Sequence, residues 1–472
     1  MSSVSALDSL LSSSSSSSSA IDLSSILQAA TGASSSGIDV TAAVNSAITA
    51  ARAPETNWEN QETTDQNQIT ALDTLQTDAT NLDNDAQALN SLTGPLSART
   101  VSSSNSSVVS GSAASGSTPG THVVIVNSLA TTASWTSGVF ADSSTALPAG
   151  SFTITTGSGS TATITTDGTE SLSDVVSQIN SDNLGVTASV VTDATGSRLA
   201  VVSNSSGSAA NFTISTSNTG FGFTQAATGA NASLTVDGIG ISSASNTVTG
   251  VVSGLTLDLA SADPGVAVTL GVAPDTSQAT TAINQFVTDY NQLVNDLTTQ
   301  FTFSGTSEGP LASDSIVRNL QSDVLGALGY TYSPTSGSTT VPNLTSLGIS
   351  VGDDGTLTVD SGTLQSTLQS NFSDVQNFFQ GTALNGFANS LDQELTSFIS
   401  PSDGAFTLDL QSINSEITDL QNNVTNFETN YITPLQTQLQ SDYSQAEILL
   451  QELPSEMQQI NEELGLNNSS QG

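Results

Sequence analysis

The residues that could do chemistry are few and scattered along the chain. His122 is the only histidine, and it lies in "THVVIVNSL", an alternating segment that predicts a strand. One histidine cannot build a His-based metal site, and any Ser–His–Asp triad would have to use it. We therefore interpret His122 as a surface position on a strand.

Asp353, Asp354 and Asp360, in "GDDGTLTVD", are the second candidate group. They suggest a weak Ca²⁺ loop, but the segment lacks the alternating oxygen ligands and the closing Glu of an EF-hand. A hairpin turn is the simpler interpretation. The sequence has no P-loop, no dinucleotide fingerprint after a strand and no cysteine. We expect no enzyme activity, no cofactor and no metal, although a glycosidase pair of carboxylates stays open.

The charge balance limits the possible partners. The 472 residues carry a net charge of −39, with four arginines and no lysine, and only 10% are charged. The chain therefore cannot neutralise the phosphates of nucleic acid or bind an anionic membrane surface. Its polar surface must come from Ser, Thr, Asn and Gln, which stay polar when carboxylates protonate near pH ~4. We hypothesise an acid-exposed, extracellular location; lower stability at about pH 4 than at about pH 7 would contradict it.

The beginning of the sequence bears on export. The first arginine is residue 52, so a basic n-region is missing, and an apolar h-region is missing too. No run reaches the ~20 apolar residues of a membrane span. We expect no membrane insertion, and export without a cleaved signal peptide if the chain is exported.

Helical patterns occupy the two ends of the chain. From Pro54 to about Leu96 the apolar residues recur at steps of three and four, which predicts one long amphipathic helix. A C-terminal seam follows the same spacing and resumes after Pro434. The stripe near the N-terminus is Leu72, Leu75, Ala79, Leu82, Ala86 and Leu89; the C-terminal seam is Ile413, Ile417, Leu420, Val424, Phe427 and Tyr431, then Leu439, Tyr443, Ala446, Leu450, Leu453, Met457, Ile460 and Leu464.

Between the ends, short β-branched runs alternate with Gly, Ser, Asn and Asp, which predicts antiparallel sheets or sandwiches. One helix, "SLSDVVSQIN", interrupts them, with Ser171 as its expected N-cap. The predicted fold class is α+β multidomain, with a helical coiled-coil stem from the N- and C-terminal segments and β-rich head domains. The expected divisions are a low-complexity disordered segment 1–36, leg and stem helices 37–105, an outer head 106–230, an inner head 231–275, a mixed α/β stem domain 276–383, and C-terminal stem and leg helices 384–472 that pair with 37–105.

Several segments in order carry a family resemblance. "GIDVTAAVNSAITAARAPETNWENQ" has the Gly-Ile-Asp, short helix and basic-Ala-Pro break that open flagellar filament cap proteins, also called flagellar hook-associated protein 2. "TPGTHVVIVNSLAT", "LTVDGIGISSASNTVTGVVSGLTLDL", "FVTDYNQLVNDL", "GPLASDSIVRNL" and "LGISVGDDGTLTVDSGTL" are similar to later parts of that family. "SLSDVVSQINSDNLGVTASVV" resembles an Ile-Asn motif module, here at Ile179-Asn180. The ends lack the family's usual Lys and Arg, and the run Ser12 to Ser19 is an unusual insertion.

The resemblance implies a function. The chain would be an extracellular cap at the distal tip of the bacterial flagellar filament, which promotes folding and polymerisation of exported flagellin. Its partners would be copies of itself in a ring-like homo-oligomer, flagellin, the flagellar export apparatus and an export chaperone. Adhesion through the heads is a further implied role.

Arg52 and Pro54 gain a specific meaning in this reading. Proline lacks an N–H and disfavours helix in the preceding residue, so it predicts a joint between a terminal leg helix and the rod. Arg52 is the cation nearest this joint and is expected to pin it to a carboxylate. The candidate oligomer or flagellin contacts are Ile38, Val40, Val44, Ile48, Arg52, Pro54, Leu450, Leu453, Met457 and Ile460.

Three other functions stay open. A hook–filament junction protein would lie at the base of the filament shaft rather than at its tip. A β-rich extracellular adhesin would use the Ser/Thr-rich heads for binding. An enzyme that acts on polysaccharide would show turnover on a glycan.

Overall fold

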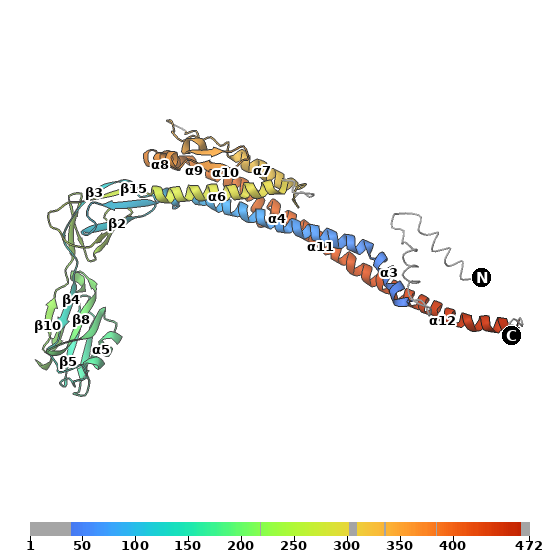
Figure 1. Cartoon of the computed structure of the whole chain (residues 1–472). Coiled ribbons are helices and arrows are strands. Elements are labelled where there is room, and N and C mark those ends of the chain that lie inside the picture. Colours follow the sequence, from blue (N-terminus) through green and yellow to red (C-terminus); the bar gives the residue numbers. More distant parts are fainter. Residues whose placement is uncertain (1–38, 218, 302–308, 335–336, 384, 464–472) are drawn as a thin grey trace. The chain divides into compact units, whose positions relative to one another are not determined.

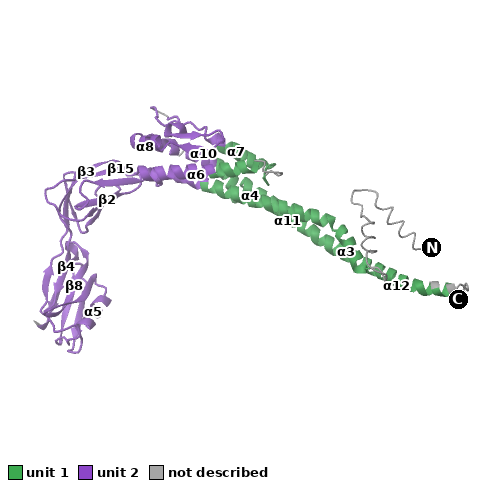
Figure 2. Ribbon diagram, in the orientation of Figure 1, with its two compact units in different colours: residues 1–81, 292–324, 394–472 green, residues 82–291, 325–393 purple. Residues whose placement is uncertain are grey.

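The structure is a computed structural model that describes residues 39–217, 219–301, 309–334, 337–383 and 385–463 (Figure 1). The expected disordered segment 1–36 lies outside the described residues. The chain forms two compact units, each built from separate stretches of sequence (Figure 2). Unit 1 comprises residues 1–81, 292–324 and 394–472, and unit 2 comprises residues 82–291 and 325–393, within the described residues.

Unit 1 is helical, and several of its helices continue into unit 2. The predicted helices at both chain ends are present, and the π-helix η5 joins the last two. The bounds are α3 Val40–Ala51, α4 Ala53–Asn90, α6 Thr276–Phe301, α7 Ser315–Ala327, α10 Phe387–Ile399, α11 Ala405–Phe427, η5 Glu428–Ile432 and α12 Thr433–Glu463.

The apolar stripe predicted on α4 is confirmed. Every one of its members is at most 1% exposed. These residues lie three or four positions apart and therefore share one face of the helix, while Thr, Asp, Asn and Gln cover the rest. Burial of this one face stabilises a helix whose sequence is otherwise polar.

The first half of the C-terminal seam, residues 413–431, differs from the prediction at its last member. Ile413 and Leu420 are buried as expected, but Tyr431 is 50% exposed and Ile432 is fully buried instead. The cause is η5, because a π-turn contains one more residue than an α-turn and so rotates the following residues. The heptad placement of Tyr431 in the seam is therefore wrong.

Unit 2 contains an inner β module, residues 99–128 and 232–274, with a core of Val, Leu and Ala between two antiparallel sheets. The sheet orders are β1-β15-β3-β11-β12 and β13-β14-β2. The strands are β1 Arg99–Ser103, β2 Val109–Ala113, β3 Gly120–Ser128, β11 Ala232–Val236, β12 Ile239–Ser243, β13 Thr247–Thr249, β14 Leu255–Leu259 and β15 Val268–Pro274.

A two-residue turn fixes the β11–β12 register. Asp237 and Gly238 have φ values of 52° and 83°. Positive φ at both central residues belongs to the type I′ turn, which matches the twist of a hairpin and favours Asp-Gly. Asp237 also accepts hydrogen bonds from Val123 N and pairs with His122 Nδ1, each at 2.8 Å. His122 thus lies on strand β3, and its partner is a turn carboxylate.

The outer β module, residues 131–227, has its own core around Phe152 and Ile154. Its sheets have the orders β10-β4-β8-β7 and β6-β5-β9. Ser171 caps helix α5 as predicted, in a capping box with Asp174. The elements are β4 Thr132–Thr136, β5 Gly150–Thr156, β6 Thr161–Thr166, α5 Leu172–Ser181, β7 Val186–Asp193, β8 Gly196–Ser206, β9 Phe212–Thr216 and β10 Thr224–Ala227.

The boundary between the two β modules differs from the expected one. Val108 to Ala130 pack in one core with residues 232–272, whereas the sequence assigned 106–230 to the outer head. The chain leaves the inner β module at Thr131 and returns to it at Ala230, and these two residues form an antiparallel bridge. Local strand patterns cannot show this, because β3 is paired with strands more than 100 residues away.

The predicted hairpin of residues 347–360 is also present in unit 2. Asp354 accepts hydrogen bonds from Thr356 N and Oγ1, and Asp360 caps the next helix, so both carboxylates have local structural roles. Helix α9 was not predicted. The elements are β16 Ile349–Val351, β17 Leu357–Val359, α8 Ser361–Ser370 and α9 Phe372–Gln380, and the short 3₁₀ turns are η1 Pro95–Ser97, η2 Ser208–Ala210, η3 Thr219–Phe221 and η4 Leu344–Leu347.

Candidate functional site

The candidate site is a joint in unit 1, where one helix ends and the next begins. Arg52 N donates to Ile48 O and closes α3, and Thr56 N donates to Arg52 O and opens α4. Pro54 lies exposed in the first turn of α4, where a missing N–H breaks no helical hydrogen bond. The helix therefore bends at a single residue, Arg52.

Arg52 bridges the two sides of this joint. Its Nη1 lies 2.6 Å from Glu55 Oε2 on α4, and its Nη2 lies 2.7 Å from Glu428 Oε1 on η5. The hydrogen bond with Glu428 is the main cause that raises the pKa of Arg52 above its ordinary value. One planar guanidinium thus ties three helical segments together, which a single-point ammonium would do less well.

An apolar cluster lies next to the ion pairs. Val44 and Ile48 of α3 are buried against Ile432 of η5, and Val40 packs at the edge of the same cluster. Residues of α12 complete it. The partly buried members are Val40, Ala51, Phe427, Leu435, Leu439 and Tyr443.

Aromatic rings cover the α4 side of the joint. Trp58 meets Phe427 edge-to-face with ring centroids 5.5 Å apart, and Phe427 stacks on Tyr431 at 5.1 Å. Pairs of this geometry add about 0.5–1.5 kcal/mol beyond burial. The π-turn places Tyr431 on this outer side while Ile432 turns inward. The sequence reasoning missed Glu55, Glu428 and Trp58; Glu55, three residues after the first arginine, was the available signal.

Beyond Tyr443 the last part of α12 presents apolar side chains without cover from the described residues. Leu450, Leu453 and Ile460 are 47–53% exposed, and Ile448 and Leu449 exceed that. Single exposed leucines need no explanation, but here five large apolar side chains between residues 448 and 460 of one helix are exposed.

The remaining predicted positions are placed as follows. Val44 and Ile48 face the chain's own α12 rather than solvent. Met457 lies in α12, but its side chain is outside the described part. Ile38 also lies outside the described residues.

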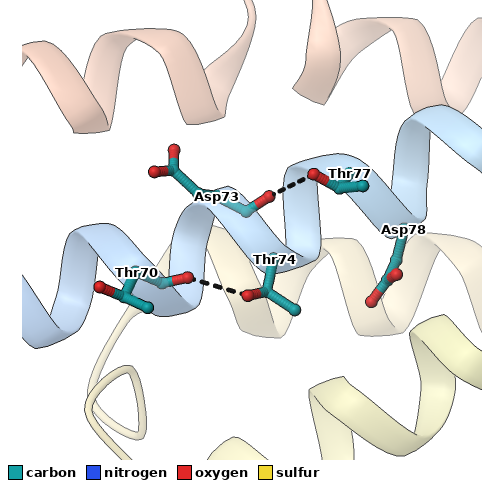
Figure 3. Close-up of a pocket in the computed structure, with 5 residues that line it drawn as sticks. All are labelled: Thr70, Asp73, Thr74, Thr77 and Asp78. Carbon is teal, nitrogen blue, oxygen red and sulfur yellow. Dashed lines mark hydrogen bonds between the residues drawn. The ribbon is translucent and has the colours of Figure 1, made fainter.

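A hollow of about 380 Å³ lies along α4, and Figure 3 labels the residues that line it. Thr74 and Thr77 donate their hydroxyl hydrogens to carbonyls of the same helix, at 2.9 and 2.8 Å. The hydroxyls are therefore already committed to the backbone. The other lining residues are Thr70, Asp73 and Asp78.

Within the described ranges, no group of three or more His, Cys, Asp or Glu side chains is arranged to hold a metal ion. No helix among the described residues has both the length and the apolar character needed to cross a bilayer.

Comparison with known proteins identifies the family. Residues 36–133 match the family model described as flagellar hook-associated protein 2 N-terminus, and residues 229–455 match flagellar hook-associated protein 2 C-terminus. The chain belongs to the flagellar hook-associated protein 2 family. The α3 and α4 residues of the joint lie in the first matched range, and its η5 and α12 residues lie in the second.

Two relatives illustrate the similarity to this family. The chain is 33% identical over 159 residues to B-type flagellar hook-associated protein 2 of Pseudomonas aeruginosa, a match covering 32% of this chain and 33% of that protein. The match to flagellar hook-associated protein 2 of Helicobacter pylori is 25% identical and covers 32% of this chain and 22% of that protein. The chain thus matches a third or less of the length of these curated relatives.

A solved structure supports the fold. The flagellar cap protein FliD D1-D2-D3 domains from Escherichia coli align with a TM-score of 0.59 and 27% identity, covering 73% of this chain and 99% of that chain. The fold class predicted from the sequence, helical segments with antiparallel β modules, is confirmed.

The outer module contains a second family feature. Residues 151–205 match the model described as flagellin hook IN motif. Ile179 is fully buried, and Asn180 pairs with the backbone of Ala188 on β7, accepting at 2.8 Å and donating at 3.0 Å. The Ile-Asn pair thus anchors helix α5 to the sheet with one apolar and one polar side chain.

Proposed function

We propose that this chain is a subunit of a bacterial flagellar filament cap, a homo-oligomer at the distal tip that helps exported flagellin fold and polymerise. The proposal rests on family membership and on one structural observation: a helical leg tied to the rest of unit 1 at one ion-paired joint. The work is binding rather than catalysis. No cofactor or metal is needed.

The leg supplies the contact surface in this proposal. Helix α3 uses its apolar side for α12, so the free apolar side chains of α12 are those after Tyr443. Leu450, Leu453, Met457 and Ile460 contact neighbouring cap subunits or flagellin. Val44 and Ile48, with Val40 at the edge, hold the two helices of the leg together.

The joint lets the leg be held and redirected. The leg is attached through one residue outside regular helix, Arg52. The ion pairs hold this residue in one conformation, and a change in its φ and ψ would move the leg as a unit. Glu and Gln side chains between the apolar positions keep the affinity for flagellin moderate, so that a subunit can be released after it folds.

Deletion of the gene tests the proposal. We expect short or absent filaments and monomeric flagellin in the medium, restored by the full-length gene. Immunogold label on the complemented strain should lie at the filament tip. Label at the shaft base would favour a junction protein, and normal filaments with lost surface attachment would favour an adhesin.

A further inference from the structure

Two neighbouring acids on α4 face acids from two other helices of unit 2. The carboxyl of Asp83 lies within hydrogen-bonding reach of Asp392 on α10, and that of Asp85 within reach of Asp289 on α6. Gln87 Nε2 donates to Asp83 Oδ2 at 2.8 Å and to Asp392 Oδ1 at 3.0 Å, so one amide nitrogen contacts both members of the first pair.

The buried sides of these carboxyls lack a donor. Asp83 is only 5% exposed, and its Oδ1 has no hydrogen-bond partner among the described residues. The same holds for Asp85 Oδ2. A buried carboxylate oxygen without a donor is costly, and beside a second carboxylate it is satisfied by one proton shared between the two.

Unit 1 contains a third pair of this kind. Asp409 on α11 lies within reach of Asp314, and its buried Oδ2 has no partner among the described residues. Asp314 Oδ1 accepts hydrogen bonds from Ile316 N and Val317 N at the start of α7, at 2.6 and 3.3 Å. Asp314 Oδ1 already accepts two backbone hydrogen bonds, whereas the buried Asp409 Oδ2 accepts none, so Asp409 is the member that gains a partner from a shared proton.

We propose that Asp83–Asp392, Asp85–Asp289 and Asp314–Asp409 are acid clasps, in which one shared proton joins two helices and its loss makes them repel. In acid each clasp is an O–H···O⁻ hydrogen bond, which is shorter and stronger than a neutral one. Above neutrality each becomes two carboxylates at contact distance in a partly dry interface.

The charged groups that face each clasp are acids. The partner carboxylate is the charge that acts on Asp83, on Asp85 and on Asp409. The arginines are engaged elsewhere, so none neutralises a clasp. Arg52 pairs with Glu55 and Glu428, and Arg198 pairs with Asp193. Arg99 donates to backbone carbonyls, and Arg318, on helix α7 just after Asp314, donates to the carbonyls of Ala312 and Ser313.

Burial, then the partner acid, raises the pKa of Asp83 and of Asp85 to about 7 and that of Asp409 to about 6. An acid with a raised folded pKa binds its proton more tightly in the folded state. Its stabilisation is complete below the unfolded pKa of about 3.9 and is lost as the pH rises through about 6 to 7. The helices that the clasps join should therefore be more stable against unfolding in mild acid than at neutral pH.

Urea unfolding of the full chain at steps between about pH 5 and about pH 8, followed by helical circular dichroism, tests the proposal. We expect the unfolding equilibrium constant to rise about ten- to hundredfold per clasp across this range. In Asp83→Asn the amide donates permanently to Asp392, so this variant should lose one clasp's contribution to the rise of the unfolding equilibrium constant with pH. Asp73→Asn, at an exposed position of α4, should keep the full rise. A midpoint that rises with pH, or equal slopes for the two variants, would overturn the proposal.

A direct measurement covers the case in which Asp83→Asn does not fold. Carboxyl ¹³C NMR of the wild-type chain should show acids titrating between about pH 6 and about pH 7. If every aspartate carboxyl titrates below about pH 5, the clasps do not exist.

Discussion

Arg52 and Glu428 lie 376 positions apart in the sequence, and their side chains meet at 2.7 Å. The pair joins the break between α3 and α4 to the π-turn between α11 and α12. Both helical segments are irregular at the same place, so the irregularities belong to one joint.

Replacement of Arg52 tests whether the ion pair restrains the joint. Arg52→Gln leaves the largely buried Glu55 beside Glu428 without a cation. Since Arg52 and Glu428 are more than a third exposed, we expect a loss of only about 1 kcal/mol in stability. Hydrogen exchange of the α3 amides should nevertheless accelerate. Arg198→Gln, which removes the exposed pair with Asp193 in unit 2, is the matched control and should leave α3 unchanged.

Because the π-turn buries Ile432 and exposes Tyr431, replacing these two adjacent residues should lower the free energy of unfolding by different amounts. Ile432→Ala removes a fully buried side chain and should cost about 2–5 kcal/mol in the free energy of unfolding. Tyr431→Ala, at a half-exposed position, should cost clearly less. Urea titrations of the two variants measure both values, and the reverse order would mean that Tyr431 occupies the seam.

The outer module should respond to acid with the opposite sign to the clasps. Hydrogen bonds from Thr195, then the ion pair with Arg198, lower the pKa of Asp193 to about 2. An acid with a lowered folded pKa stabilises the fold above its unfolded value, and this contribution is lost as the pH falls through about 2. The carboxyls of Asp142, Asp167 and Asp174 in this module also have lowered pKa values, through hydrogen bonds chiefly from their neighbouring Ser and Thr residues.

Tryptophan fluorescence can follow the loss of stability of the outer module in acid. In a Trp58→Phe variant the remaining tryptophan is Trp135, which lies in the outer module and donates to Phe212 O at 2.9 Å. Its signal should change between about pH 4 and about pH 2. Adding Asp193→Asn should flatten the transition, and an unchanged acid midpoint would remove Asp193 from this account.

The exposed end of α12 yields a functional prediction that depends on the proposed cap role. The double change Leu450→Ser and Leu453→Ser should leave the stability of the isolated chain within about 0.5 kcal/mol, because both side chains are half exposed. It should shorten filaments in a complemented deletion strain. Leu408→Ser, equally exposed on α11, is the control. Filaments of normal length from the double variant would exclude these residues as contacts.

How far the sequence predicts this structure depends on the range of the interactions involved. The stripe from Leu72 to Leu89 and the cap at Ser171 follow from neighbours within one or two turns, and both are present. The Asp-Gly turn at 237–238 is equally local. The exchange of Tyr431 for Ile432 was not predictable, because Pro434 marks an irregularity in the helix but does not show that the register shifts by one residue before it.

The site shows the same limit. Arg52 stood out because cations are rare in this chain, but its partner Glu428 is one of 43 acids and carries no local mark. The Asp83–Asp392 contact likewise needs the pairing of α4 with α10, which no single helix pattern contains. Spatial partners of a distinctive residue were therefore less predictable than the residue itself.

The bridge between Thr131 and Ala230 has a consequence for how such a chain can change. Their backbones exchange two hydrogen bonds, at 2.9 and 3.3 Å, at the place where the chain leaves and returns. Everything between them is an insertion with its own core, attached at adjacent points. An insertion attached in this way can be enlarged, exchanged or deleted while the strand order of the inner β module stays intact, so the outer β module can diversify in sequence without repacking the core from which it emerges.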